Sequence, residues 1–120
     1  MGSCGYAIWG GSNGGLLVGA ALTQLPELYR AVVCCHPDLD MVRYYKYTKN
    51  NNPPALLEHG NAAIPEQFKF LYAYSPYERV RAGTKYPAVL FDQNAPRPLA
   101  RFCGRRLARI HPRIHPRIHL

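Results

Sequence analysis

The sequence lacks the features that mark membrane, secreted and metal-binding or redox proteins. It has no apolar run near the ~18 residues of a membrane span, and Met1–Tyr6 lacks the basic and apolar segments of a signal peptide. Its four cysteines show no C-x-x-C spacing, the usual mark of a zinc or redox site. We therefore expect reduced thiols, no cofactor, no metal, no membrane contact and a cytoplasmic location.

Acidic residues are missing from the C-terminal part of the chain. Residues 97–120 contain seven arginines and no Asp or Glu, whereas residues 1–96 contain eight Lys and Arg against seven Asp and Glu. The net charge of +8 therefore belongs to the tail, and we expect no nucleic-acid partner. A non-catalytic protein whose tail binds polyanions stays open as an alternative, because clustered arginines attract anionic surfaces.

What is present is the pattern of one small α/β domain. Tyr6–Trp9 is a short apolar run typical of a buried strand, and it stops at the glycine-rich turn Gly10–Gly15. Leu16–Gln24 is apolar nearly all round, as in a helix packed on a sheet, and Ala31–Cys35 predicts a second buried strand. A strand, turn, helix and strand in this order indicate a βαβ unit, and hence a parallel sheet.

The second half of the chain changes character twice. Residues 37–85 form a looser excursion in which Pro65–Tyr74 predicts a helix, and Tyr86–Phe91 predicts a third strand. Arg and Pro then dominate, and prolines at every fourth position near the end forbid a regular helix. We therefore divide the chain into a partial catalytic domain, residues 1–91, and a divergent Arg/Pro/His-rich tail, residues 92–120, which we expect to be disordered.

The glycine-rich turn carries the chemistry, because Gly10-Gly-Ser-Asn-Gly14 fits the G-x-S-x-G pattern between a buried strand and a helix. Such an elbow strains the backbone of Ser12 and exposes its hydroxyl, while glycines at 10 and 14 let strand and helix approach. Ser12 is thus the predicted nucleophile, and the backbone N–H of Asn13 the predicted oxyanion donor. A phosphate-binding loop is excluded, since its Gly-Lys-Ser/Thr or G-x-G-x-x-G patterns are absent. A structural turn without a catalytic role stays open as an alternative.

Several segments, in order, resemble landmarks of the prolyl oligopeptidase family: Ala7–Val18, Pro26–Cys34, Leu39–Met41, Phe70–Tyr77 and Tyr86–Leu90. The resemblance implies an α/β-hydrolase domain with a parallel sheet, which cleaves short peptides through an acyl-enzyme on Ser12. It also implies that a β-propeller and a second oxyanion donor precede this region in full-length relatives. The tryptophan that stacks on the substrate proline in relatives has no counterpart in Pro54–Gly60. Proline specificity is therefore a weaker expectation than peptidase ancestry.

The resemblance ends where the family's aspartate and histidine should follow. Asp92 lies about three positions too early to match the catalytic aspartate, so it is only a weak candidate. His111, His115 and His119 follow it in the repetitive tail, without an expected scaffold to fix a general base or a closed metal site. We interpret the tail as the out-of-frame continuation of a truncated gene.

These expectations combine into one functional prediction. The chain is a truncated serine-type peptidase fragment, feebly active or inactive alone, with Ser12 as its nucleophile. An α/β-hydrolase esterase stays open beside the polyanion-binding alternative, because a nucleophilic serine alone does not distinguish ester from peptide substrates.

Overall fold

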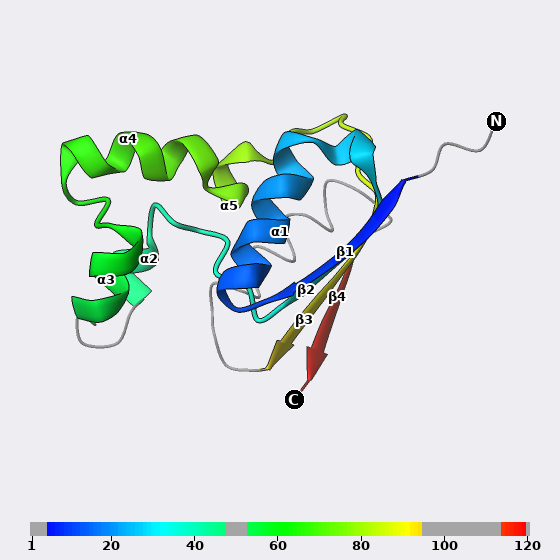
Figure 1. Cartoon of the computed structure of the whole chain (residues 1–120), viewed down its shortest axis with the longest axis horizontal. Helices are drawn as coiled ribbons and strands as arrows, with labels where there is room; N and C mark the ends of the chain where they lie inside the picture. The colour runs from blue at the N-terminus through cyan, green and yellow to red at the C-terminus, as the bar shows by residue number, and fades with distance from the viewer. Residues whose placement is uncertain (1–4, 48–52, 95–113, 120) are drawn as a thin grey trace.

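The computed structural model describes residues 5–47, 53–94 and 114–119, which form a four-stranded sheet with helices beside it (Figure 1). The strands are all parallel and lie in chain order: β1 (Tyr6–Gly11), β2 (Tyr29–Cys35), β3 (Ala88–Asn94) and β4 (Ile114–His119). Because parallel strands end at the same edge of a sheet, the carboxyl ends of β1, β2 and β3 share one edge of the sheet. The predicted α/β class with a parallel sheet is confirmed.

The first helix lies between the sheet and the helical excursion (Figure 1). Helix α1 begins at the first residue after the elbow serine and ends before Pro26, whose ring starts a short 3-10 turn. The predicted helix at Pro65–Tyr74 is present as α4. The bounds of the helices are α1 (Asn13–Gln24), η1 (Pro26–Leu28), α2 (Tyr44–Tyr47), α3 (Pro53–His59), α4 (Pro65–Tyr74) and α5 (Pro76–Arg79). In the described part of the chain, no helix is long and apolar enough to span a membrane.

Two apolar clusters use opposite faces of α1. The larger cluster lies between α1 and the sheet and includes Val18, Leu22 and Phe91. The smaller one joins Leu16 of α1 to Met41 and Leu71, and so attaches the excursion to the helix. This explains why α1 is apolar nearly all round, since a helix buried on two sides has little surface left for polar residues.

Two buried polar residues, Ser75 and Asp40, fix the segment around residues 39–43 within the excursion. The fully buried Ser75 hydroxyl accepts a hydrogen bond from the Met41 N–H at 3.1 Å and donates to the Leu39 carbonyl at 3.4 Å. The nearly buried Asp40 carboxylate accepts hydrogen bonds from the Arg43 backbone N–H at 3.1 Å and its Nε at 2.6 Å. These residues therefore have structural roles, since buried polar groups stay stable only when they are paired.

The neighbouring cysteines of β2 lie on opposite faces of the sheet. Cys34 is fully buried, and this burial, with a smaller contribution from neighbouring Cys35, raises the pKa of its thiol to about 12. Cys35 is half-buried on the other face, where its Sγ accepts a hydrogen bond from Trp9 Nε1 at 3.2 Å. Both thiols are free, in line with the prediction of reduced cysteines, while Cys4 and Cys103 lie outside the described residues.

This difference predicts selective alkylation. Iodoacetamide at about pH 8 should modify Cys35 in the folded chain and leave Cys34 unmodified, because the thiolate is the nucleophile and burial both shields Cys34 from the reagent and keeps its thiol protonated. Peptide mapping by mass spectrometry after a short pulse measures both sites. The same pulse in denaturant is the control, and it should modify the two cysteines equally. Equal modification of both in the folded chain would contradict the burial of Cys34.

The tail differs from its prediction at two places. β3 runs to Asn94, beyond the expected boundary at residue 91, and residues 114–119 form β4 rather than an irregular segment. β4 pairs in parallel with β3, so that Pro116 lies opposite Phe91. Without β4, the outer edge of β3 would leave a row of N–H and C=O groups unpaired, and the edge position of β4 tolerates a proline. The predicted disorder of the remaining tail falls on residues outside the described ranges.

Candidate active site

Ser12 occupies a strained turn between β1 and α1. Its φ of 53° and ψ of −117° lie in a sparsely populated region that costs an ordinary residue about 1–3 kcal/mol. Two backbone hydrogen bonds hold it there: its N–H donates to the Cys35 carbonyl at 2.9 Å, and its carbonyl accepts from the Leu16 N–H at 3.1 Å. The residue itself is exposed. The turn therefore has the geometry of the predicted nucleophile elbow.

The glycines around Ser12 have different roles. A Cβ at Gly10 would clash with the Gly14 carbonyl oxygen and lie 2.5 Å from its carbon, so Gly10 permits the predicted close approach. A Cβ at Gly14, by contrast, would meet nothing within 4 Å. The second essential glycine is Gly15, where a Cβ would lie 2.8 Å from the Pro37 Cβ. The close approach predicted at Gly14 is thus found at Gly15, which faces the end of β2.

Asn13 is the first residue of α1, so its backbone N–H has no acceptor within the helix and points out of the positive helix end. A carbonyl attacked by Ser12 would develop a negatively charged oxygen near this N–H, which matches the predicted role of oxyanion donor. The Asn13 side chain donates a hydrogen bond from Nδ2 to Glu58 Oε1 of α3 at 3.1 Å. Sequence reasoning missed Glu58, because no local pattern signals a contact between residues so far apart.

Asp92 lies at the same sheet edge as the elbow, but not beside it. It stands opposite Cys35 in the register of β2 and β3, and its carbonyl accepts a hydrogen bond from the His36 N–H at 2.7 Å. Since β3 is two strands from β1, the backbones of Asp92 and Ser12 are separated by about 10 Å. In a triad the aspartate bonds to the histidine and not to the serine, so this separation is compatible with Asp92, which stays a weak candidate.

The two histidines whose side chains the structure describes are His36 and His59. Among the described residues, the Ser12 hydroxyl makes no hydrogen bond to a histidine. His36 directly follows Cys35, is exposed and has a φ of 48°, while His59 packs edge-on against Tyr44 with ring centroids 5.3 Å apart. Sequence reasoning treated His36 as a surface histidine. It missed that His36 directly follows Cys35, whose carbonyl accepts the hydrogen bond from the Ser12 N–H.

The tail histidines are only partly placed. His115 and His119 lie on β4, where the register sets His119 opposite Asn94, three strands from β1. His111 lies outside the described residues. Within the part of the chain that the structure describes, no group of three His, Cys, Asp or Glu side chains could hold a metal ion.

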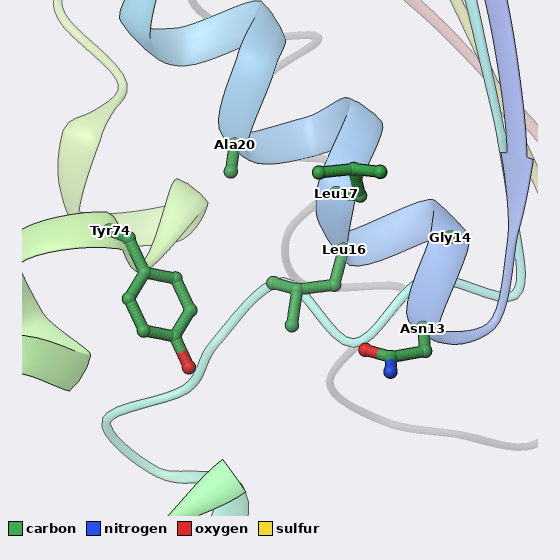
Figure 2. A pocket seen from close by; sticks show the side chains of 6 residues that line it. All are labelled: Asn13, Gly14, Leu16, Leu17, Ala20 and Tyr74. Carbon is green, nitrogen blue, oxygen red and sulfur yellow. The ribbon is translucent and has the colours of Figure 1, made fainter.

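A groove opens beside the elbow, along the face of α1 that looks away from the sheet (Figure 2). Its volume is about 540 Å³, and its walls are mainly apolar. The residues that line it are Asn13, Gly14, Leu16, Leu17, Ala20 and Tyr74. Asn13 and Gly14 directly follow Ser12 in the chain, so one end of the groove lies beside the elbow.

Comparison with known proteins places this geometry in a family. Residues 3–93 match the prolyl oligopeptidase family. The chain is 45% identical over 87 residues to an uncharacterized peptidase of Rickettsia prowazekii, covering 72% of this chain and 12% of that protein. It is 41% identical over 85 residues to the prolyl endopeptidase of Elizabethkingia meningoseptica, covering 70% of this chain and 12% of that protein.

A solved structure gives the same result. The chain superposes on a post-proline cleaving enzyme from Rickettsia typhi with a TM-score of 0.81 and 36% identity, over 93% of this chain and 16% of that one. The chain therefore spans about an eighth of the length of the curated relatives it matches. The fold, the elbow and these similarities together show that the chain belongs to the prolyl oligopeptidase family.

Proposed function

We propose that Ser12 is the nucleophile of a serine-type peptidase that hydrolyses short, proline-containing peptides. The observation that carries this proposal is the backbone of Ser12, an exposed serine held at positive φ between a strand and a helix. A non-glycine residue pays a cost for this conformation, so a structural turn would favour glycine or asparagine at the position. A serine there presents its hydroxyl above the end of the sheet.

The chemistry follows from the two residues of the turn. Ser12 Oγ attacks the peptide carbonyl and forms a C–O bond, and the negative charge collects on the carbonyl oxygen. The Asn13 N–H donates a hydrogen bond to that oxygen, a contribution of about 3–4 kcal/mol per donor in related sites. The C–N bond then breaks, and the amine leaves with the proton that the Ser12 hydroxyl has lost. Water then attacks the acyl-enzyme, which breaks its C–O bond, releases the acid and returns a proton to Ser12 Oγ.

The remaining machinery is proposed to come from other parts of a full-length protein. In relatives of this family we expect an upstream propeller that limits access to short peptides, and a second oxyanion donor on an earlier strand. The general base is the part of the proposal that the described residues do not supply, because none of their histidines is hydrogen-bonded to the Ser12 hydroxyl. We therefore propose that the 120-residue chain alone is a weak catalyst.

A fluorophosphonate probe tests the role of Ser12. We expect slow labelling of the folded chain at Ser12, since a hydroxyl without its base is a poor nucleophile, and complete loss of that label in Ser12→Ala. Mass spectrometry locates the adduct, and heat-denatured chain controls for nonspecific reaction. Equal labelling of Ser12→Ala, or of the denatured chain, would refute the nucleophile assignment.

A further inference from the structure

One face of the sheet is not covered by any helix of the described residues. The strands lie in chain order, β1-β2-β3-β4, and every neighbouring pair is parallel. Crossovers between parallel strands are almost always right-handed, so connections that step in the same direction lie on the same face. Figure 1 shows the labelled helices on one side of the strands. The opposite side, here called the bare face, lacks a helix layer in the described chain, although parallel sheets are usually covered on both sides.

Burial alternates along the strands, as this arrangement requires. On the α1 side, Val32, Val89 and Phe91 are at most 3% exposed. On the bare face, every residue of the central part of β1, β2 and β3 is apolar and either exposed or half-buried. These residues are Ala7 and Trp9 of β1, Ala31 and Val33 of β2, and Ala88 and Leu90 of β3.

The register of the strands arranges these six residues in two rows that run across the sheet. The row of large side chains consists of Trp9, Val33 and Leu90. The row of small side chains consists of Ala7, Ala31 and Ala88. The rows are two residues apart along each strand, which is about 7 Å. The bare face therefore has a ridge with a shallow groove beside it.

Trp9 is the largest side chain of the ridge, and its one polar group is already paired. Its Nε1–H donates a hydrogen bond to Sγ of Cys35, on the neighbouring strand, at 3.2 Å. The indole has no other donor or acceptor to offer a partner, yet Trp9 is 70% exposed. A partner on this face therefore has to meet the indole with apolar groups.

We propose that the bare face binds a second copy of this chain, so that two sheets pack face to face in a two-fold dimer. A two-fold axis between the sheets, parallel to the rows and midway between them, places the ridge of each copy in the groove of the other. Trp9 of one copy then packs on the partner's Ala7, and the strands of the two sheets run in opposite directions. The bare face is thus complementary to itself, as a two-fold contact requires.

The size of the bare face sets the expected strength of the dimer. Four strands of six or seven residues form a face of about 19 by 21 Å at the usual spacings. Two such faces bury about 800 Å² when counted as flat, which is at the low end of specific interfaces. We therefore expect a Kd of about 10 μM. Helix α1 lies on the other side of the sheet, so the proposal does not depend on the role of Ser12.

The chain has a single tryptophan, Trp9, which makes the bare face its own reporter. Tryptophan emission and sedimentation velocity are measured from about 0.5 to 200 μM, about 20-fold below and above the expected Kd. Reducing agent and about 0.15 M salt are present, and the salt screens the positive tail. We expect monomers with water-exposed emission at low concentration. At high concentration we expect dimers whose emission lies at shorter wavelength, because the indole leaves water.

Matched variants separate the bare face from general hydrophobicity. Trp9→Glu should raise the Kd at least about 30-fold, as the loss of an aromatic anchor usually does. Its circular dichroism should stay that of the parent, because the side chain is mostly exposed. Leu17→Glu is the control, since Leu17 is 69% exposed but lines the groove on the far side of α1. It should keep the Kd of the parent.

A mixture of two variants tests the ridge-to-groove register. Ala7→Lys also replaces an exposed residue, and alone it should stay monomeric, because the partner's Trp9 would cover the new charge. When Trp9→Glu and Ala7→Lys chains are mixed, a heterodimer should form with a Kd within about tenfold of the parent. The introduced glutamate then lies against the introduced lysine, while the second contact between Trp9 and the partner's Ala7 stays intact.

Each result supports or overturns the proposal. Dimerisation that Trp9→Glu abolishes, Leu17→Glu preserves and the mixture restores supports it. A chain that stays monomeric at 200 μM overturns it, and short-wavelength emission at every concentration then shows that another part of the same chain covers Trp9. Association that Leu17→Glu weakens as much as Trp9→Glu does is general aggregation and overturns it as well. A mixture that stays monomeric overturns the two-fold arrangement.

Discussion

Gly10→Ala is expected to lower the free energy of unfolding by about 4 kcal/mol, close to the upper end for a single substitution. The new methyl group would clash with the Gly14 carbonyl oxygen and lie 3.0 Å from Val18 Cγ1. The Gly14 carbonyl is backbone and cannot turn aside, so β1 and α1 must separate and expose part of the larger cluster. The melting temperature should fall by roughly 15 °C.

Gly14→Ala is the matched control. Its methyl group would meet nothing within 4 Å, and alanine favours a helix by about 1 kcal/mol over glycine, so this variant should be as stable as the parent or more so. Urea unfolding followed by circular dichroism measures both variants. A Gly10→Ala chain as stable as Gly14→Ala would show that the elbow is looser than the structure indicates.

The elbow could be predicted from sequence because every signal for it is local. Apolar residues before Gly10, an apolar helix after it and a serine between small residues leave few other structures for the segment. The positive φ of Ser12 and the exposure of its side chain agree with that prediction. The parallel sheet followed from the same βαβ pattern, since a parallel pair needs a crossover of this length.

Other features depend on contacts between distant residues, which no local pattern reveals. The sequence does not show which of the two adjacent glycines, Gly14 or Gly15, allows a close approach. Only the direction of α1 determines that Gly15 packs against Pro37. The Asn13–Glu58 hydrogen bond depends likewise on how the excursion folds back. Residues 114–119 contain a proline, which disfavours strands, and the open edge of β3 nevertheless pairs with them.

The largest expected effect concerns catalysis. Hydrolysis of a prolyl p-nitroanilide by the 120-residue chain should stay near the uncatalysed background, about a million-fold below a complete serine peptidase, because loss of the general base alone costs that much. The described residues provide no histidine hydrogen-bonded to Ser12. Release of p-nitroaniline over hours, with Ser12→Ala as the blank, measures the rate.

Turnover of about 1–1000 per second would contradict this prediction and require a base that the geometry can identify. His36 would be the first residue to test, since it adjoins the Cys35 carbonyl that accepts the Ser12 N–H at 2.9 Å. His119 lies on β4, about 14 Å from the backbone of β1 at the usual strand spacing. Single alanine variants at His36, Asp92, His111, His115 and His119 should therefore all leave the background rate unchanged. If one of them instead abolished a measured activity, that residue would be part of the missing machinery.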